Sequence, residues 1–351
     1  MRQLSMDGQT DRQMWIDIYK GVSIILVIIG HLVIPQTLYN FIFSFHMYAF
    51  FFIAGVTFKV KKEQSLGSFV IENIKRLYIP YLFFAFAWDI TNIVIESYLS
   101  KSLDWSIWEI LKNIASVIIG KGIFESTASV GPSWFLLAFL VVRIVCWLLL
   151  KLSDNRIWVF GVVSIILFAV GYLVNGYDFL PFRLFSTLTA FLFMFIGYCC
   201  KKTYTIIKKT NLLLKLSGTI IAFSIALIMS MLADKPLVLA SNILPSNPMI
   251  TLVGGLAGCF GLLILAILIE DIPVLSKLLV YYGINSLIIM GVHSEIYFAL
   301  RLILEVYIGV SEKYLAFIIC LLILVLAIPI CIILNNHCAI LVGKRKVVEK
   351  P

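Results

Sequence analysis

Three of the four histidines in this chain lie inside long apolar segments, where a titratable side chain is costly to bury. His31 ends the run "WIDIYKGVSIILVIIGH", His46 lies near the start of "FSFHMYAFFFIAGVTF", and His293 lies inside "GINSLIIMGVHSEIYF". An imidazole, with an unperturbed pKa of about 6.5, can accept or release a proton near neutral pH. The histidines therefore indicate proton-transfer chemistry within a membrane.

Lys20 and Asp17 lie on the helix face that also carries His31. The eleven steps along the chain from Lys20 to His31 rotate a helix by about 20° more than three full turns. At about 1.5 Å per step, the two residues lie about 16 Å apart. Asp17, three residues before Lys20, shares that face. A helix here carries a cation at one end and an imidazole near the other.

His31 and His46 are expected at one depth in the membrane. Counting residues from the segment ends places His31 roughly 9 Å and His46 roughly 7 Å below the outer surface of a bilayer core about 30 Å thick. Two imidazoles on consecutive antiparallel helices should then meet, although a lone histidine can also simply bond a neighbouring hydroxyl or carbonyl. For His293, two interpretations stay equally open: a role in the functional site, or a structural hydrogen bond to a neighbouring hydroxyl or carbonyl.

Arg143 and Trp134 are further candidates, both within "PSWFLLAFLVVR". A buried guanidinium must pair with something, so Arg143 either anchors a carboxylate such as Asp89 or Glu295 or binds a ligand. Trp134 begins its segment at the outer interface, where tryptophan commonly belongs to the aromatic belt of a membrane protein. A contact with substrate is the alternative for Trp134.

The composition predicts an all-α polytopic membrane protein. With 61% hydrophobic and 13% charged residues, and a mean hydropathy of +1.02, the chain is too apolar for a soluble globule, in which about 25% of residues are charged. Its apolar stretches are long enough to span a bilayer and lack the alternation of barrel strands. The ten predicted spans are 16–36, 42–60, 78–98, 133–152, 157–175, 182–200, 213–233, 249–269, 283–303 and 313–335.

The distribution of Lys and Arg predicts a multi-pass protein of the cell membrane with both termini cytoplasmic. With the termini inside, cytoplasmic segments hold 20 of the 28 Lys and Arg residues, against seven on the outer side. Lys75 and Arg76, in "IKRLYIPYLFF", belong to the inner set, and phosphate binding is a second interpretation of this pair. The net charge of +9 suits anionic membrane lipids or a phosphorylated cofactor and does not indicate nucleic acid.

The chain is predicted to form a single membrane domain over residues 1–351. Its helical core covers 15–340, a basic cytoplasmic tail covers 341–351, and the external loop 99–132 contains an interfacial or re-entrant helix near "DWSIWEILKNIASVIIG". The seven cysteines show no CxxC spacing, so neither a disulfide framework nor a metal site is expected. The N-terminus lacks the pattern of a cleaved signal peptide.

Five segments together resemble the acyltransferase-3 superfamily of integral membrane acyltransferases, and within it the fucose 4-O-acetylase-like branch. They are "WIDIYKGVSIILVIIGH", "FSFHMYAFFFIAGVTF", "IKRLYIPYLFF", "PSWFLLAFL" and "GINSLIIMGVH". The resemblance covers essentially the whole bundle and keeps the family's motif order. Its most specific element is a basic residue and a histidine with ten residues between them, which Lys20 and His31 provide.

The resemblance implies a ten-helix core that takes an acyl group, usually acetyl, from cytoplasmic acyl-coenzyme A. The group is placed on a hydroxyl of a surface or lipid-linked sugar. Essential roles are implied for Lys20 and His31. The other family motifs map onto His46, Lys75, Arg76 and Trp134. The chain departs from the family at Tyr48, where proline is frequent, and at Ala54, where serine is frequent, and these departures leave the acceptor sugar open.

Geometry and resemblance predict one reaction, with acetyl-CoA as co-substrate and no metal. The phosphates of coenzyme A stay beside Lys20, Lys75 and Arg76, and the thioester arm reaches His31. His31 acts as a general base on the sugar hydroxyl or carries the acyl group covalently. His46 orients His31 or donates a hydrogen bond to the developing oxyanion. The predicted supporting or substrate-binding residues are Asp17, Trp134, Arg143 and His293.

Two other classes of function stay open on the sequence. A transporter of polysaccharide or lipid-linked oligosaccharide also needs many spans and buried charges, but it has no reason to place a cation one thioester arm below a histidine pair. A membrane sensor or scaffold has no soluble output domain here. Product formation that depends on acyl-CoA discriminates an enzyme from both.

Overall fold

The computed structural model describes residues 13–100, 106–120, 130–177, 180–304, 309 and 315–344, with the side chains of 96–100 excepted. The regular elements within these residues are helices, which confirms the predicted all-α class. The N-terminal tail to residue 12, the loop residues 101–105 and 121–129, and the tail beyond 344 lie outside the described residues.

The helices are α1 (Met14–Gly30), α2 (Gln36–Phe43), α3 (His46–Thr57), α4 (Leu66–Asn73), α5 (Ile79–Ser100), α6 (Ile107–Ile119), α7 (Trp134–Leu152), α8 (Ile157–Leu173), α9 (Leu184–Leu188), α10 (Ala190–Cys199), α11 (Thr203–Lys208), α12 (Leu212–Met231), α13 (Pro248–Ile269), α14 (Pro273–Ile284), α15 (Ser286–Leu302) and α16 (Ala316–His337). A π-helical segment, η1 (Ile74–Tyr78), joins α4 to α5, and three short 3-10 turns complete the chain: η2 (Gly131–Ser133), η3 (Pro181–Arg183) and η4 (Leu239–Ser241).

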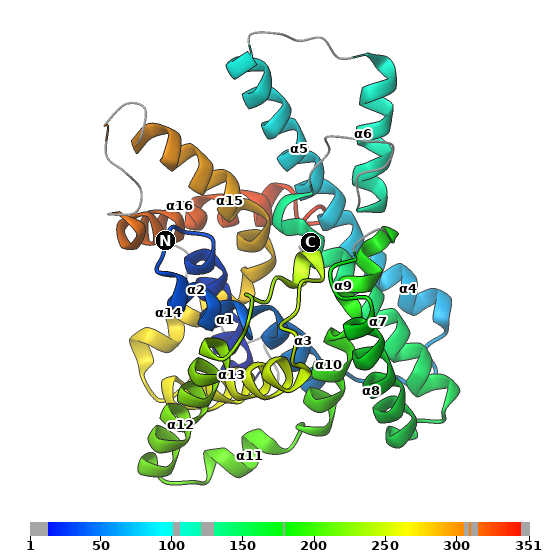
Figure 1. Ribbon diagram of the computed structural model, residues 1–351, viewed down its shortest axis with the longest axis vertical. Helices are drawn as coiled ribbons and strands as arrows, with labels where there is room; N and C mark the ends of the chain where they lie inside the picture. The colour runs from blue at the N-terminus through cyan, green and yellow to red at the C-terminus, as the bar shows by residue number, and fades with distance from the viewer. Residues whose placement is uncertain are drawn as a thin grey trace, which may run out of the picture.

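Helix α1 lies at the centre of the bundle, where it packs against α3, α13 and α14 (Figure 1). Helix α10 packs against α3, α12 against α13, and α15 against α16. At the top of the view, α5 and α6 extend away from the other helices. The bundle thus surrounds the helix that carries the Lys20 and His31 pair.

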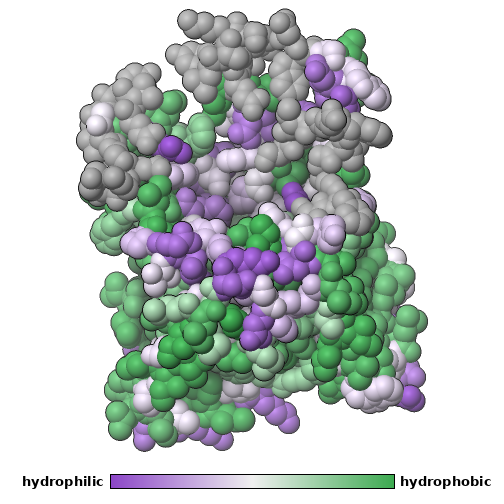
Figure 2. All heavy atoms as spheres, viewed as in Figure 1, coloured by the Kyte–Doolittle hydropathy of each residue, from purple (hydrophilic) through white to green (hydrophobic). Residues whose placement is uncertain are grey.

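Much of the outer surface is apolar. The face in Figure 2 is hydrophobic over its lower part and sides, and hydrophilic residues gather across its middle. Large side chains such as Val274 (83% exposed), Phe317 (76%) and Leu213 (74%) point away from the protein. Surfaces of this kind are stable against lipid, so together with the apolar helices they identify a multi-pass membrane protein.

The predicted ten spans are not confirmed. Among the described residues, six helical stretches are long and apolar enough to cross a membrane, or up to eight if each of two bent pairs is one span. The six are Gln36–Thr57, Leu66–Ile95, Gly131–Leu152, Leu212–Met231, Pro248–Ile269 and Ala316–His337. The pairs are α9 with α10, bent by 61° and counted from Pro181, and α14 with α15, bent by 82°. The two remaining predicted spans correspond to α1 and α8, which have 17 residues each. A helix of that length is about 25 Å long, which is shorter than the hydrocarbon core of a bilayer.

The predicted boundaries of the first two spans are also corrected. Helix α1 ends at Gly30, and His31 occupies its C-cap. Pro35 is the N-cap of α2, and a residue before proline disfavours helical geometry, so the helix predicted over 16–36 cannot continue to its end. The second span begins earlier than predicted, at Gln36, and is interrupted between α2 and α3.

Two stretches predicted as inner loops are helical. Residues 273–284 form α14, which starts with Pro273 at a position where proline is favoured. Helix α4 continues through η1 into α5, and within η1 the N–H of Ile79 donates to the carbonyl of Ile74, five residues back. Pro80 lacks an N–H and cannot donate to the carbonyl of Arg76, which explains the π-helical interruption at this place.

Two glycines bring α1 and α14 into backbone contact. A β-carbon on Gly283 would overlap the carbonyl oxygen of Asp17, and one on Gly21 would overlap the carbonyl oxygen of Leu279. Small residues allow membrane helices to approach this closely. The contact places the bend that follows α14 directly beside the cationic end of α1.

Candidate functional site

Three histidines converge where α1, α3 and α15 meet. The rings of His31 and His293 meet edge to face, with centroids 5.0 Å apart. The ring of Phe43 lies 6.3 Å from that of His31 and 4.7 Å from that of His46, between centroids. The predicted neighbours His31 and His46 therefore share Phe43 as a common neighbour, and the imidazole packed directly against His31 is that of His293.

In all three rings Nδ1 faces a main-chain carbonyl oxygen about one turn back in the chain. The distances are 2.8 Å from His31 to Val27, 2.9 Å from His46 to Ile42, and 2.9 Å from His293 to Met290. Because a carbonyl oxygen only accepts hydrogen bonds, Nδ1 carries the proton in each neutral ring. The lone pair of each ring is then on Nε2, which is the basic atom.

His31 is the accessible member of this cluster. Its side chain is exposed, whereas His46 is 2% and His293 is 1% exposed. The hydroxyl of Ser294 donates to Nε2 of His293 at 3.3 Å, so His293 is held through both ring nitrogens. His293 is thus a fixed wall against which His31 packs, and the Nδ1 contact of His31 leaves Nε2 as its basic atom.

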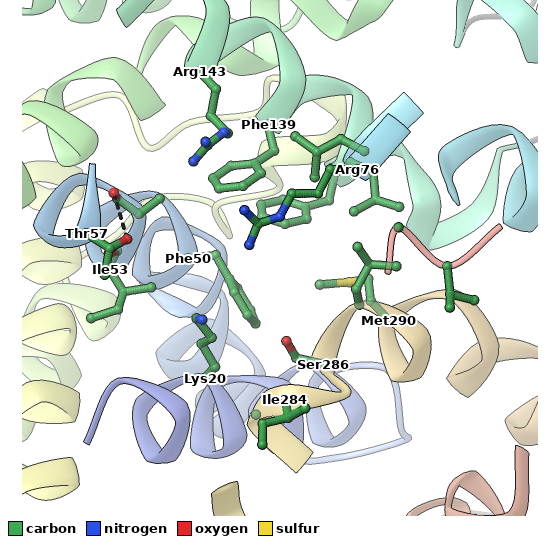
Figure 3. Close-up of a pocket in the computed structure, with 18 of the residues that line it drawn as sticks. Lys20, Phe50, Ile53, Thr57, Arg76, Phe139, Arg143, Ile284, Ser286 and Met290 are labelled. Atoms are coloured by element: carbon green, nitrogen blue, oxygen red, sulfur yellow. Dashed lines mark hydrogen bonds between the residues drawn. The ribbon is translucent and has the colours of Figure 1, made fainter. Parts of the chain in front are cut away.

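A cavity of about 240 Å³ lies beside Lys20, among α1, α3, α7, η1 and the bend between α14 and α15 (Figure 3). Four cations line it: Lys20, Arg76, Arg143 and Lys344. Among the described residues that line it, none is acidic. Cations that face one partly buried space favour a ligand with several negative charges.

Lys20 is positioned by the buried carboxylate of Asp17. Their charged atoms are 3.6 Å apart, and the side chain of Asp17 is 3% exposed while that of Lys20 is 31% exposed. The carboxylate is anchored within the bundle and the ammonium points into the cavity (Figure 3). The predicted stripe of Asp17 and Lys20 is therefore present at the cavity end of α1.

Arg143 faces the same cavity from α7. Its Nε donates to Oδ1 of Asn73 at 2.8 Å. Its guanidinium carbon lies 5.4 Å, 5.9 Å and 5.7 Å from the ring centroids of Phe58, Phe69 and Phe139. Neither Asp89 nor Glu295 is the partner, because a neutral amide and aromatic faces surround the group and hold its charge without cancelling it.

Three helices each carry a cavity residue and a histidine. The pairs are Lys20 and His31 on α1, Phe50 and His46 on α3, and Met290 and His293 on α15. Along each helix the separations are about 16 Å, 6 Å and 4.5 Å. Helices α1 and α15 run from the cavity toward the histidines and α3 runs back, so the histidine cluster lies one turn beyond Phe50 and Met290.

Two predicted residues are placed elsewhere. Lys75 is exposed on η1 and is not among the residues that line the cavity, so of the predicted basic pair only Arg76 reaches it. Trp134 is 9% exposed, with its ring centroid 6.1 Å from that of Phe135, which lines the cavity. Trp134 is therefore buried beside a residue of the cavity wall and is not itself among the lining residues.

Sequence reasoning missed Lys344 and Asn73 as parts of the site. Lys344 lies near the start of the basic C-terminal tail, and the excess of Lys and Arg expected in cytoplasmic segments already accounts for the charge of that tail. No feature of the sequence therefore distinguished Lys344 as a site residue. Asn73 immediately precedes the segment that contains Arg76, and that adjacency is the signal that could have found it. The described part of the chain holds no group of three His, Cys, Asp or Glu side chains placed to bind a metal ion.

Comparison with known proteins adds an independent finding. A family model described as an acyltransferase domain matches residues 14–335. No curated protein matches the chain, and no solved structure does. The matched range contains the three clustered histidines and three of the four cavity cations, and it ends before Lys344.

Proposed function

Because the chain belongs to the acyltransferase-3 family and is a membrane acyltransferase, we propose that it transfers an acetyl group from acetyl-CoA to a hydroxyl of a surface or lipid-linked sugar. The observation that carries the proposal is the cationic cavity at one end of α1, with His31 and its basic Nε2 at the other. The fucose 4-O-acetylase-like branch stays a prediction about the acceptor.

The cavity supports a coenzyme A thioester as donor. The diphosphate and the 3′-phosphate of coenzyme A are strongly anionic, and Lys and Arg are the side chains that bind such groups. Lys20, Arg76 and Arg143 approach one space from three different elements (Figure 3). With the phosphates held there, the thioester arm extends past Phe50 and Met290 toward the histidines.

His31 supplies the proton transfer in the direct route. Nε2 of His31 takes the proton of the sugar hydroxyl while the sugar oxygen attacks the thioester carbonyl carbon. The carbon–sulfur bond of the resulting tetrahedral intermediate then breaks, and the leaving thiolate takes the proton back from the imidazolium. The enzyme returns to its starting state with one acetyl ester formed and one free coenzyme A released.

The hydrogen bonds favour a positioning role for His46. In the neutral ring Nδ1 donates to Ile42, so Nε2 has no proton to give to an oxyanion. Of the two roles left open by the sequence, orientation of the reacting groups near His31 is the one that this tautomer supports. His293 contributes by fixing the ring plane of His31 through their edge-to-face contact.

The two-step route differs from the direct route by one covalent intermediate, in which His31 carries the acetyl group. Nε2 of His31 attacks the thioester carbonyl carbon, and coenzyme A leaves as the thiolate. The sugar oxygen then attacks the acetyl carbon, the bond from that carbon to Nε2 breaks, and the hydroxyl proton passes to the thiolate. Incubation of the purified protein with radiolabelled acetyl-CoA and no acceptor separates the routes. Label that stays on His31 supports the two-step route, and its absence with active enzyme supports direct transfer.

The orientation that suits this reaction puts the cavity on the cytoplasmic side and His31 toward the outer face of the cell membrane. The excess of Lys and Arg in the segments assigned to the cytoplasm supports this orientation. The donor then enters from the cytoplasm, and the glycan acceptor is reached at the opposite surface.

Surface polysaccharide from cells with and without the gene tests the function directly. We expect O-acetyl signals in the NMR spectrum of the glycan that disappear with the gene, together with acetyl transfer from acetyl-CoA by the purified protein. Glycan export that depends on the gene, without any acylated product, would contradict the proposal and favour a transporter.

Arg143→Gln is expected to raise the KM for acetyl-CoA by about tenfold, because a charged hydrogen-bond partner of a phosphate contributes about 1.5 kcal/mol or more. Arg143→Lys keeps the charge but loses the planar fork, and we expect an intermediate KM. Steady-state kinetics with acetyl-CoA varied at saturating acceptor measure both.

Arg156→Gln is the matched control, since Arg156 is exposed at the start of α8 and does not line the cavity. Its KM should equal that of the wild type. If Arg143→Gln lowered the thermal midpoint but left KM unchanged, Arg143 would be only a structural residue.

A further inference from the structure

The last described residues fold back onto the cavity. After α16, residues 338–344 form a turn in which the N–H of Lys344 donates to the carbonyl of Ala339 at 2.8 Å. Val342, Gly343 and Lys344 all line the cavity, and Val342 is only 2% exposed. This C-terminal turn (residues 338–344) is therefore a packed part of the cavity wall.

Gly343 places the C-terminal turn against η1. Its φ is +71°, a backbone conformation that favours glycine. A β-carbon on Gly343 would lie 2.5 Å from the carbonyl oxygen of Arg76 and 3.1 Å from Cγ of Pro80. The turn thus meets the backbone of η1 at the carbonyl that Pro80 leaves without its usual helical donor.

Lys344 ties the same turn to the bend between α14 and α15. Its Nζ donates to Oδ1 of Asn285 at 2.9 Å, and Nδ2 of Asn335 donates to the same oxygen at 2.9 Å. Asn285 directly precedes Ser286, which lines the cavity. The amide oxygen of Asn285 therefore orients the ammonium group of Lys344 at the cavity wall.

We infer that Lys344 is a fourth anion-binding residue, which the C-terminal turn delivers to the phosphate-bearing end of a coenzyme A thioester. The inference rests on the proposed function. Cations from four separate elements, α1, η1, α7 and the turn, converge on one cavity without an acidic lining residue among those described. Several cations around one partly buried space favour a ligand with several negative charges, and Lys binds phosphate as a point charge.

The test compares Lys344→Gln with Lys277→Gln in the purified full-length protein, with coenzyme A as the titrant in isothermal titration calorimetry. Lys277 is exposed on α14 and does not line the cavity. We expect Lys344→Gln to raise the Kd for coenzyme A about tenfold, Lys277→Gln to leave it unchanged, and Lys344→Arg to stay within about twofold of the wild type.

Two thioesters separate charge recognition from a structural effect. The KM of Lys344→Gln for acetyl-CoA should rise by the same factor as the Kd, whereas its KM for S-acetyl-pantetheine, which has no phosphate, should not rise. An equal rise for both thioesters would overturn the inference, because Lys344 would then act through the fold.

Gly343→Ala tests the delivery of Lys344 by the turn. The strained backbone and the close approach to Arg76 should displace the turn, so coenzyme A should bind less tightly than to the wild type. Unchanged coenzyme A binding in both Gly343→Ala and Lys344→Gln, with normal binding to the wild type, would overturn the inference and leave the proposed function intact. A wild-type protein that neither binds coenzyme A nor transfers acetyl would overturn the proposed function itself.

Discussion

His31→Asn is expected to lower acetyl transfer by about 10²- to 10⁴-fold, the contribution of a positioned general base. The asparagine amide N–H can replace Nδ1 as donor to the carbonyl of Val27, which accepts from His31 at 2.8 Å. The substitution removes the basic Nε2 and keeps the local hydrogen bond. The measurement is kcat for acetyl transfer by purified protein at saturating acetyl-CoA, together with the Kd for coenzyme A.

His337→Gln provides the matched control. His337 is exposed at the end of α16, on a different helix from the three clustered histidines, so its replacement should leave kcat unchanged. For His31→Asn, coenzyme A binding should also be unchanged, because the phosphate-binding residues are a helix length away. Full activity of His31→Asn would contradict the assignment of His31 to the chemistry.

Gly283→Ala is expected to destabilise the protein and disturb the site together. The added β-carbon would overlap the carbonyl oxygen of Asp17, so α1 and α14 must move apart. Overpacking of this kind costs about 1–3 kcal/mol of folding free energy. Because Asp17 positions Lys20 at the cavity, we expect a lower thermal midpoint by intrinsic tryptophan fluorescence and a higher KM for acetyl-CoA.

Gly67→Ala is the control for this substitution. No heavy atom lies within 4 Å of the position of a β-carbon on Gly67, and the residue is exposed in α4. Alanine is favoured over glycine by roughly 0.5–1 kcal/mol in a helix interior, so the thermal midpoint should stay the same or rise. If Gly283→Ala behaved like Gly67→Ala, the close contact between α1 and α14 would not be present in the protein.

The fold class and the family followed from local properties of the chain. Apolar stretches of sufficient length predict membrane helices whatever their partners are, and the motif around Lys20 and His31 depends on spacing along one helix. The number of spans did not follow, because a count of apolar residues does not register a bend. At Asn285 the chain turns by 82° between α14 and α15, and the helices α1 and α8 are each only 17 residues long.

The partners of the candidate site residues needed the folded chain. The pairing of His31 with His293 joins residues far apart in the sequence, and Arg143 meets Asn73 instead of a carboxylate. Lys344 reaches the cavity only because the C-terminal turn packs against η1. None of these contacts leaves a periodic signal in the sequence.

The sequence by itself determined the helical class, the apolar character of the helices and the separation of Lys20 from His31 along the chain, since each is a local consequence of residue type and helix geometry. The tertiary structure decided which helix faces meet, and so which cations and histidines share a space. The physical reason is that lipid and protein interior are both apolar, so hydrophobic pattern does not distinguish the two faces of a membrane helix. That choice is made by close packing at small residues such as Gly21 and Gly283 and by the few polar contacts inside the bundle.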